Sequence, residues 1–378
     1  MNMKLIYLLN QRFPTEKAYG IQTIQMCAAF ASQSVDVELF VPTRRSNEGS
    51  DPFTYYGMPH SFGFTSIPSP DWHLPGILER SSFWLKSVFS AVRLVVAGQK
   101  HRADIFYTRD EIVALLAVFF GKRVCLELHS FSRMRLPMYW VLRGLGVRLV
   151  CITQILGEQM RRVGFSRRSI LIAPDGFDDA AFHDLPERSE ARRRVHLPEG
   201  VPVALYAGHL YPWKGVDMLA KAAPHIDGIV VFVGGTESDI ERMKEKYRTT
   251  ANIVFIGHRS HREIPLWLRA ADVVVIPNLQ GQAISRLYTS PLKMFEYMAS
   301  GTPIVASDLP SIREVLNDGN ALLVRPGDPA ALAAGIIESF NTGGLSRVRG
   351  QRAQHDAYNY TWNKRSKAII DFIAFPFF

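Results

Sequence analysis

Apolar residues occur along this chain in short runs, and longer stretches with a helical spacing of apolar and polar positions separate most of these runs. Short runs rich in Val, Ile, Leu and Phe are typical of buried strands, whereas apolar positions three and four residues apart are typical of amphipathic helices. Because helices join neighbouring parallel strands, the alternation predicts parallel sheets with helices on both faces. The predicted strands form two groups, 4–9, 35–41, 105–108, 123–128, 148–153 and 169–173, then 203–207, 228–233, 252–256, 273–277, 303–307 and 321–324.

Helices are predicted between these strands, for example at 21–33, 217–223, 238–246, 264–270 and 292–300. The 378 residues suffice for two domains. The predicted fold class is therefore α/β, with two tandem doubly wound, Rossmann-like domains that face a cleft, where ligands bind beyond the carboxyl ends of the strands. We expect an N-terminal domain over 1–185, a polar, charged linker over 186–202 and a C-terminal domain over 203–355. Residues 50–75, rich in Pro, Gly, Ser and aromatic residues, are predicted to form a long loop.

Composition narrows the class of partner and compartment. Lys and Arg number 44 against 35 Asp and Glu, a formal charge of +9, which favours anionic partners such as phosphates, acidic membrane or nucleic acid. The three cysteines have no metal-ligand spacing, which argues against a disulfide scaffold or zinc site and fits a reducing cytoplasm. The sequence shows no export signal, and no apolar run approaches the roughly 20 residues that span a bilayer.

The segment 204–215, ALYAGHLYPWKG, predicts an anion-binding loop after a strand. Gly208 and Gly215 allow close approach of the backbone, His209 and Lys214 bring positive charge, and the following helix adds the partial charge of its N-terminus. The P-loop pattern is absent, since no Gly-Lys-Ser/Thr follows. A surface turn with a solvated lysine would show the same residues.

A second segment, 289–303, reads TSPLKMFEYMASGTP and predicts a helix that begins beside an anion. Ser290 is suited to cap this helix and Pro291 to its first turn, so that backbone N–H groups near 290–293 would face a ligand. Glu296 could accept two hydrogen bonds from a ribose diol. The alternative is a glutamate on the surface of a helix.

Together the two segments resemble the retaining GT-B glycosyltransferases of family 4, also called glycosyl transferases group 1. The similarity comprises Gly208, Lys214 and Gly215, then the run 296–307 (EYMASGTPIVAS), and then 311–315 (SIREV). The strand near 252–257, the run 271–277 (ADVVVIP) and the run 173–178 (APDGFD) resemble the family as well. These features occur in the family's order and cover most of 203–325 closely.

The resemblance implies a role for each matching residue in the donor site. Lys214 would contact the donor diphosphate, Glu296 the nucleotide ribose, and the backbone of the four residues Ser290, Pro291, Leu292 and Lys293 the same diphosphate. Two positions depart from the family: Tyr288 replaces the first glutamate, which normally touches the donor sugar, and His209 replaces an arginine, so that Lys214 would be the main cation. The helix over 356–378 resembles the family's last helix, which crosses back to the N-terminal domain.

In the N-terminal half, the resemblance places Gly20 at the glycine-containing turn after the first strand. It also makes His129 a candidate catalytic residue near the transferred sugar, together with Lys214. Tyr107 and Arg109, at the end of another strand, are candidates for the acceptor side. A structural histidine and a structural arginine are the alternatives.

Residues 123–168 contain nine arginines and two acidic residues, interleaved with apolar side chains. Such a segment fits an amphipathic surface on anionic lipid, and the acceptor of many relatives is lipid-linked. The alternative is a solvated basic face. No nucleic-acid module is visible, so we expect no nucleic-acid partner. We expect the protein in the cytoplasm, with peripheral attachment to the inner face of the membrane as the alternative.

We therefore expect a retaining glycosyltransferase that moves a sugar from a nucleotide-diphosphate donor to a glycan or lipid-linked acceptor, in bacterial-type polysaccharide or glycoconjugate synthesis. No cofactor and no metal are expected, because no Asp-x-Asp ends a predicted strand. Two alternatives share the donor: a nucleotide-sugar epimerase of the same architecture, and a non-catalytic nucleotide-sugar-binding subunit. A nicotinamide-dependent dehydrogenase is disfavoured, because Gly-x-Gly-x-x-Gly is absent after the first strand.

Overall fold

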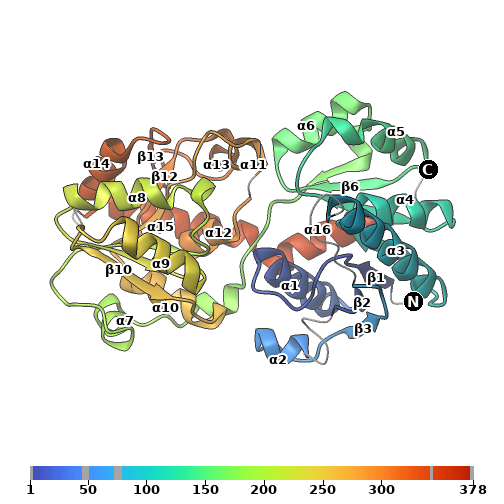
Figure 1. Ribbon diagram of the computed structural model, residues 1–378, viewed down its shortest axis with the longest axis horizontal. Helices are drawn as coiled ribbons and strands as arrows, with labels where there is room; N and C mark the ends of the chain where they lie inside the picture. The colour runs from blue at the N-terminus through green and yellow to red at the C-terminus, as the bar shows by residue number, and fades with distance from the viewer. Residues whose placement is uncertain (1–2, 45–50, 72–78, 289, 341–343, 375–378) are drawn as a thin grey trace. The chain divides into compact units, whose positions relative to one another are not determined.

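Two compact units make up the protein, one of residues 1–174 with 362–378 and the other of residues 175–361. The structure is a computed structural model and describes residues 3–44, 51–71, 79–288, 290–340 and 344–374 (Figure 1). Each unit contains one sheet, and every strand pair in it is parallel. Two parallel sheets covered by helices confirm the predicted α/β class with two Rossmann-like folds.

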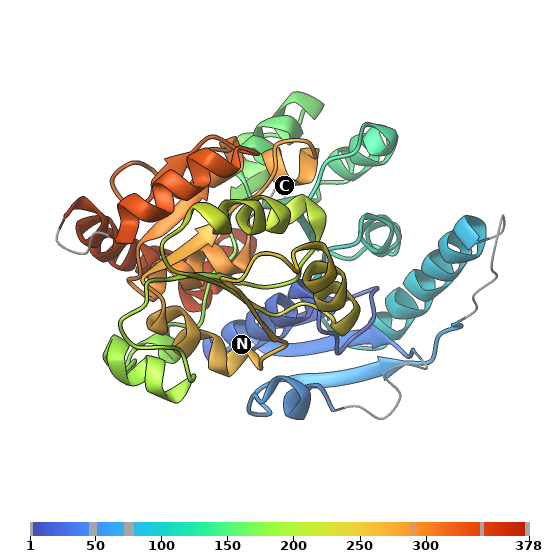
Figure 2. The same cartoon turned by 60° about the vertical axis from the view of Figure 1, so that its left-hand side comes forward.

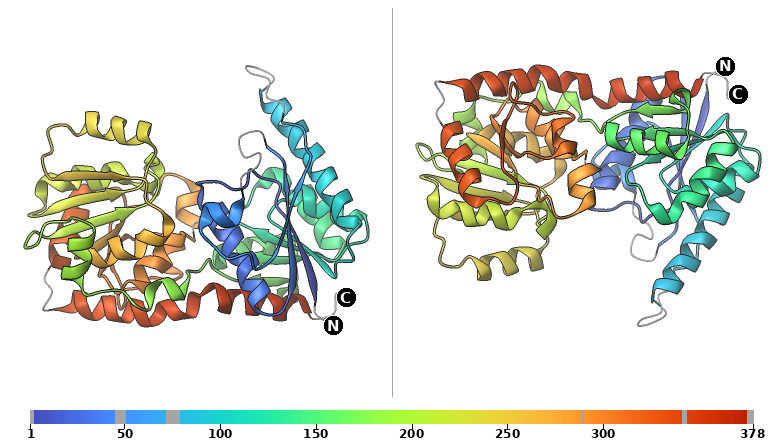
Figure 3. Two further views of the ribbon diagram at one scale, coloured as in Figure 1. Left: turned by 90° about the horizontal axis from the view of Figure 1, so that it is seen from below. Right: turned by 90° about the horizontal axis from the view of Figure 1, so that it is seen from above.

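The first unit has a seven-stranded sheet in the order β3-β2-β1-β4-β5-β6-β7. Its order reverses between β1 and β4, which is where doubly wound sheets bind ligands. The helices α1 and α16 pack together, and α3, α4 and α5 pack in succession, on the opposite face of the sheet (Figure 3). The elements are β1 (Lys4–Leu8), α1 (Ala18–Ser32), β2 (Asp36–Pro42), α2 (Pro52–Tyr56), β3 (Gly63–Ile67), α3 (Glu79–Gln99), β4 (Ile105–Thr108), α4 (Glu111–Phe119), β5 (Val124–Leu128), α5 (Leu136–Gly144), β6 (Arg148–Cys151), α6 (Gln154–Val163), β7 (Ile170–Ile172) and α16 (Trp362–Ala374).

The second unit has a six-stranded sheet in the order β10-β9-β8-β11-β12-β13 and reverses between β8 and β11. One face packs on α8, α9 and α14, and the other on α7, α10, α12 and α15, so that each face has its own apolar core. The elements are α7 (Arg188–Arg194), β8 (Val203–Ala207), α8 (Val216–Ala222), β9 (Ile229–Val233), α9 (Glu237–Lys246), β10 (Ile253–Gly257), α10 (Ile264–Ala270), β11 (Val273–Ile276), α11 (Ala283–Leu287), α12 (Leu292–Ala299), β12 (Ile304–Ser307), α13 (Pro310–Arg313), β13 (Leu322–Val324), α14 (Pro329–Phe340) and α15 (Leu345–Ala357).

The structure differs from the sequence prediction in two segments. Residues 50–75 are not one loop, because α2 and the edge strand β3 lie within them; residues 50 and 72–75 fall outside the described residues. The expected linker over 186–202 contains α7, and Arg188 and Arg192 both pair with Asp272, which precedes β11. The segment therefore belongs to the second unit, and the division falls at Pro174 rather than after residue 185.

Candidate functional site

The carboxyl ends of β8 and β11 form one candidate site, in the second unit. Gly208 follows β8 with φ of 130°, and its N–H donates to the carbonyl of Val233 at the end of β9 (2.8 Å). Gly215 closes the same loop with φ of 74°, and a Cβ there would lie 1.7 Å from the carbonyl oxygen of Pro277. Only glycine permits this contact, which fixes the loop 208–215 against the end of β11.

Lys214 ends a short turn in this loop, next to the start of α8. Its ammonium lies 5.5 Å from the ring centroids of both Tyr211 and Trp213. Burial lowers the pKa of Lys214 to about 8, because removal from water disfavours the charged form. A cation held in this way gains most from an anion that replaces the lost water. His209 stacks on Tyr211, with the ring centroids 5.1 Å apart.

The helix α12 is tied to the same edge of the sheet. The hydroxyl of Tyr297 accepts a hydrogen bond from the N–H of Ala207, the last residue of β8 (2.7 Å). Pro291 is the N-cap of α12, so our prediction that Ser290 caps this helix is wrong. The Ser290 hydroxyl instead accepts a hydrogen bond from the N–H of Asp175 (3.0 Å), which fixes the approach to the helix.

Glu296 lies on the same helix and is 8% exposed, so it is not the solvated surface glutamate of the alternative interpretation. Its carboxylate Oε1 contacts Nε2 of His261 at 2.5 Å. Burial alone would lower the pKa of His261, but the charges of Glu296 and Asp178 outweigh it, so the pKa is raised. Tyr288, where the family has its first glutamate, is 8% exposed.

The second candidate site surrounds Glu127, at the end of β5 in the first unit. This carboxylate is fully buried and accepts hydrogen bonds from Gln22 Nε2 (2.7 Å) and from the Tyr107 hydroxyl. Arg365 of α16 pairs with its Oε2 at 3.2 Å, and Nε2 of His129 lies 2.5 Å from its Oε1. Although burial opposes ionisation, Arg365 and His129 hold the pKa of Glu127 well below its usual range.

The four site residues that the sequence predicts in the first unit differ in their exposure and contacts. They are His129, Arg109, Tyr107 and Gly20. His129 is partly exposed and is held by Glu127. Arg109 donates to Oε1 of Gln22 (2.9 Å) and is also partly exposed.

Tyr107 is fully buried, so the prediction that it lines an acceptor surface is wrong; its hydroxyl serves Glu127 instead. Gly20 lies inside α1 rather than in a turn before it. A Cβ there would lie 2.1 Å from the Tyr56 hydroxyl, which bonds the backbone of Thr15. Its observed role is therefore to let α1 pack against α2 and the residues before the helix.

Sequence reasoning missed Gln22, Arg365 and His261 as members of these clusters. Gln22 has a signal, since it is a polar residue in a helix that is otherwise largely apolar and buried. Arg365 has none, because the residue lies on the last helix, far along the chain from Glu127.

The first unit also has an apolar and basic surface on α3, α4 and α5. On α3, Leu85, Phe89, Val92 and Val96 are exposed at helical spacing. Further exposed apolar side chains are Phe83, Trp84, Phe119, Phe120, Met134, Trp140, Val141 and Leu145. Figure 2 shows α3 running along the side of its unit near β3.

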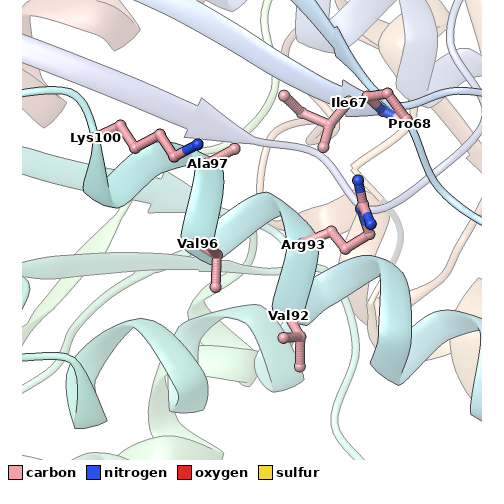
Figure 4. Close-up of a pocket in the computed structure, with 7 residues that line it drawn as sticks. All are labelled: Ile67, Pro68, Val92, Arg93, Val96, Ala97 and Lys100. Carbon is pink, nitrogen blue, oxygen red and sulfur yellow. The ribbon is translucent and has the colours of Figure 1, made fainter.

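A groove of about 380 Å³ lies on this surface, between α3 and the end of β3. It is lined by Ile67, Pro68, Val92, Arg93, Val96, Ala97 and Lys100, which combine apolar and cationic side chains (Figure 4). It contains none of the residues predicted for the donor site.

Within residues 123–168, several arginines have internal partners. Arg148 donates to the carbonyl of Phe372, Arg123 to that of Ile373, and Arg135 pairs with Glu111. Fewer arginines of 123–168 are therefore available to a basic surface than the composition suggests. The cationic side chains of α3 add to this surface.

Over the described part of the chain, no helix is long and apolar enough to cross a bilayer. In the same ranges, His, Cys, Asp and Glu side chains form no cluster of three with the geometry of a metal site.

Residues 201–341 match the family model described as "Glycosyl transferases group 1". A D-inositol 3-phosphate glycosyltransferase of Streptomyces bingchenggensis is 26% identical over 249 residues, which are 61% of this chain and 53% of the relative. A phosphatidyl-myo-inositol mannosyltransferase of Mycolicibacterium smegmatis is 30% identical over 203 residues, 52% of this chain and 50% of the relative. The chain thus matches about half the length of these curated relatives.

Solved structures of low sequence identity share the fold. HepE of Anabaena, in complex with UDP-glucose, has a TM-score of 0.77 at 16% identity and is covered over 100% of its length by 99% of this chain. A sucrose-phosphate synthase of Thermosynechococcus elongatus has a TM-score of 0.78 at 18% identity, with 99% of this chain and 98% of that one covered.

Proposed function

Since the chain belongs to the glycosyl transferases group 1 family and has its GT-B fold, we propose that it transfers a sugar, with retention of configuration, from a nucleotide-diphosphate donor to a glycan or lipid-linked acceptor. The observation that carries the proposal is the glycine-bounded loop 208–215, which holds the partly desolvated Lys214 at the switch point of the second sheet. A diphosphate is the part of the donor that such a site fits.

The main energetic demand of the reaction is the negative charge that develops on the departing diphosphate. Cations and backbone N–H groups that are fixed before the reaction stabilise such a charge without reorganisation. We assign this task to Lys214 and the N-termini of α8 and α12, because Gly215 and Tyr297 hold these elements against the sheet. Glu296 would accept hydrogen bonds from the ribose diol, in exchange for its contact with His261.

In this mechanism the bond between the anomeric carbon and the leaving phosphate oxygen breaks while the acceptor oxygen bonds to the same face of the sugar. The proton of the acceptor hydroxyl passes to the leaving phosphate. His129 would contact the transferred sugar, and Glu127 fixes the orientation of its ring through Nε2. Glu127 is therefore a positioning residue.

The surface of α3, α4 and α5 supports an acceptor at an anionic membrane. Exposed Trp84, Leu85 and Phe89 could enter the lipid interface, while Arg93 and Lys100 meet anionic headgroups. One relative is a phosphatidyl-myo-inositol mannosyltransferase, a name that places its acceptor on a lipid. This proposal extends the predicted lipid surface from residues 123–168 to α3.

The test is to incubate the full chain with labelled UDP-, GDP- and ADP-sugars, with and without a membrane lipid extract. We expect transfer from one donor class only when an acceptor is present, and loss of that transfer in Lys214→Ala. The matched control is Lys221→Ala, an exposed lysine on α8. Conversion of the donor without acceptor would identify an epimerase, and binding without turnover would identify a non-catalytic subunit. Full transfer by Lys214→Ala would contradict the charge argument.

A further inference from the structure

A second lysine lies buried at the same edge of the second sheet, and its ammonium makes no hydrogen bond to any residue that the structure describes. Lys293 is on the first turn of α12 and is 9% exposed, and its Nζ is covered completely. Its close neighbour is the face of Tyr206, whose ring centroid lies 3.6 Å away. A cation–π contact compensates only part of the cost of burying a charge.

The ammonium is directed at the glycine that begins the loop 208–215. A Cβ placed on Gly208 would lie 3.9 Å from Lys293 Nζ, so Nζ stands beside the backbone at the end of β8. Burial, and next the charge of Lys214, hold the pKa of Lys293 well below its usual range, while Glu296 acts in the opposite direction. The loop and the helix thus bring Lys214 and Lys293 close enough for the charge of Lys214 to act on Lys293.

Lys293 is also linked to this loop through His209, the residue after Gly208. The ring of His209 is stacked on Tyr211. The carbonyl of His209 accepts a hydrogen bond from the hydroxyl of Tyr206, the residue over whose ring Lys293 lies (2.7 Å). Tyr206 therefore links the ammonium of Lys293 to the loop 208–215.

We propose that the ammonium of Lys293 binds the donor diphosphate together with Lys214. The inference rests on the proposed function and deepens it. A buried lysine without an anion is partly neutral, whereas the same lysine against a diphosphate is protonated. Binding therefore takes up a proton from the solvent, and that proton stays on Nζ while the phosphate oxygen accepts a hydrogen bond from it.

The test is calorimetric titration of the full chain with UDP, GDP and ADP, using Lys293→Met and the control Lys221→Met. Met keeps an unbranched apolar stem that is one atom shorter than lysine, so we expect a folded variant. If the thermal unfolding of Lys293→Met is abnormal, Lys293→Gln serves as the second variant. We expect the nucleoside diphosphate that the wild type binds to bind about 10- to 100-fold more weakly to Lys293→Met. Lys221→Met is expected to bind as the wild type does.

Proton uptake is measured by repeating the titration in two buffers of different ionisation enthalpy between pH 7 and 9. We expect the wild type to take up more protons on binding than Lys293→Met does, since Lys214 titrates in both proteins. Equal affinity and equal proton uptake in the two proteins would overturn the role of Lys293 and leave the proposed function standing. If the wild type binds none of the three diphosphates, the proposed function itself fails.

Discussion

The two units each bury a charged side chain beside a predicted ligand site, and the two charges are treated differently. Glu127 in the first unit is surrounded by Arg365, His129, Gln22 and the Tyr107 hydroxyl. Lys293 in the second unit lies over an aromatic face, with Lys214 and Glu296 acting on it in opposite directions, and its ammonium makes no hydrogen bond to a described residue. A buried charge with all its partners holds a structure together, whereas one without an anion is poised to bind one.

Removing the carboxylate of Glu127 should have the largest effect on stability. Glu127→Ala leaves Arg365 buried without its carboxylate, and we expect it to lower the free energy of unfolding by about 3–5 kcal/mol. Urea denaturation followed by circular dichroism measures this. Glu158→Ala, which removes an exposed carboxylate on α6, is expected to change stability by less than about 0.5 kcal/mol. Equal effects of the two changes would contradict the assignment of Glu127.

Removal of the Lys214 ammonium should weaken ligand binding rather than folding. We expect Lys214→Ala to weaken nucleoside diphosphate binding by about 1.5–3 kcal/mol, the range for a hydrogen bond to a charged group. Because the pKa of Lys214 is about 8 without ligand, wild-type affinity should fall as pH rises above 8, when binding must first protonate the lysine. Titrations from pH 7 to 9.5 measure this slope. An affinity independent of pH would exclude Lys214 from the site.

Removing the charge of Lys293 should raise the free energy of unfolding, whereas removing Glu127 should lower it. Lys293→Met should raise the free energy of unfolding by about 1–2 kcal/mol, as replacement of buried charged groups by apolar ones often does. Because the pKa of Lys293 is lowered in the folded state, its charged form destabilises the protein. This destabilisation is complete below the folded-state pKa and disappears above the unfolded-state pKa of about 10.4. The gain in Lys293→Met should therefore shrink as pH approaches 10. A loss of stability at pH 7 would mean that Lys293 has a partner within the protein.

The pair of His261 and Glu296 should have the smallest effect. His261 is partly exposed, so we expect His261→Gln to cost about 1 kcal/mol of stability. The pKa of His261 is raised in the folded state, so its contribution is complete below about pH 6.5 and disappears as pH rises through the folded-state pKa. Thermal unfolding at pH 6 and pH 8.5 measures the difference, and substitution of an exposed histidine, His225→Gln, is the control. A pH-independent difference would contradict the ion pair.

Most strands could be predicted from the sequence because they are largely apolar runs, and several of them, such as β8 and β11, are buried along their whole length. The strand β3 was missed because it is an edge strand, Gly63–Ile67, with a single buried residue among turn-forming neighbours. The loop 208–215 could be predicted because its glycines and lysine lie within one short segment of the sequence. The partners of Glu127 could not, since Gln22, Tyr107 and Arg365 meet only through the order of strands and the return of α16.

The resemblance to a family assigned Lys293 a backbone role, and only the fold shows where its ammonium lies. For Tyr107 and Gly20, by contrast, the sequence predicted a place near a ligand and the fold shows an internal role. Each stands at a strand end or helix start where ligand contact is common, yet one serves Glu127 and the other makes room for Tyr56. Position along the chain predicts which edge of a sheet a residue occupies, whereas packing decides whether it faces a ligand.

The most direct test of the central claim is to titrate the wild type and Lys214→Ala with UDP, GDP and ADP side by side by calorimetry. The account predicts saturable binding of at least one diphosphate at one site per chain, and a loss of about 10- to 100-fold in affinity in the variant. Absence of binding by the wild type to all three, or equal binding by both proteins, would contradict it.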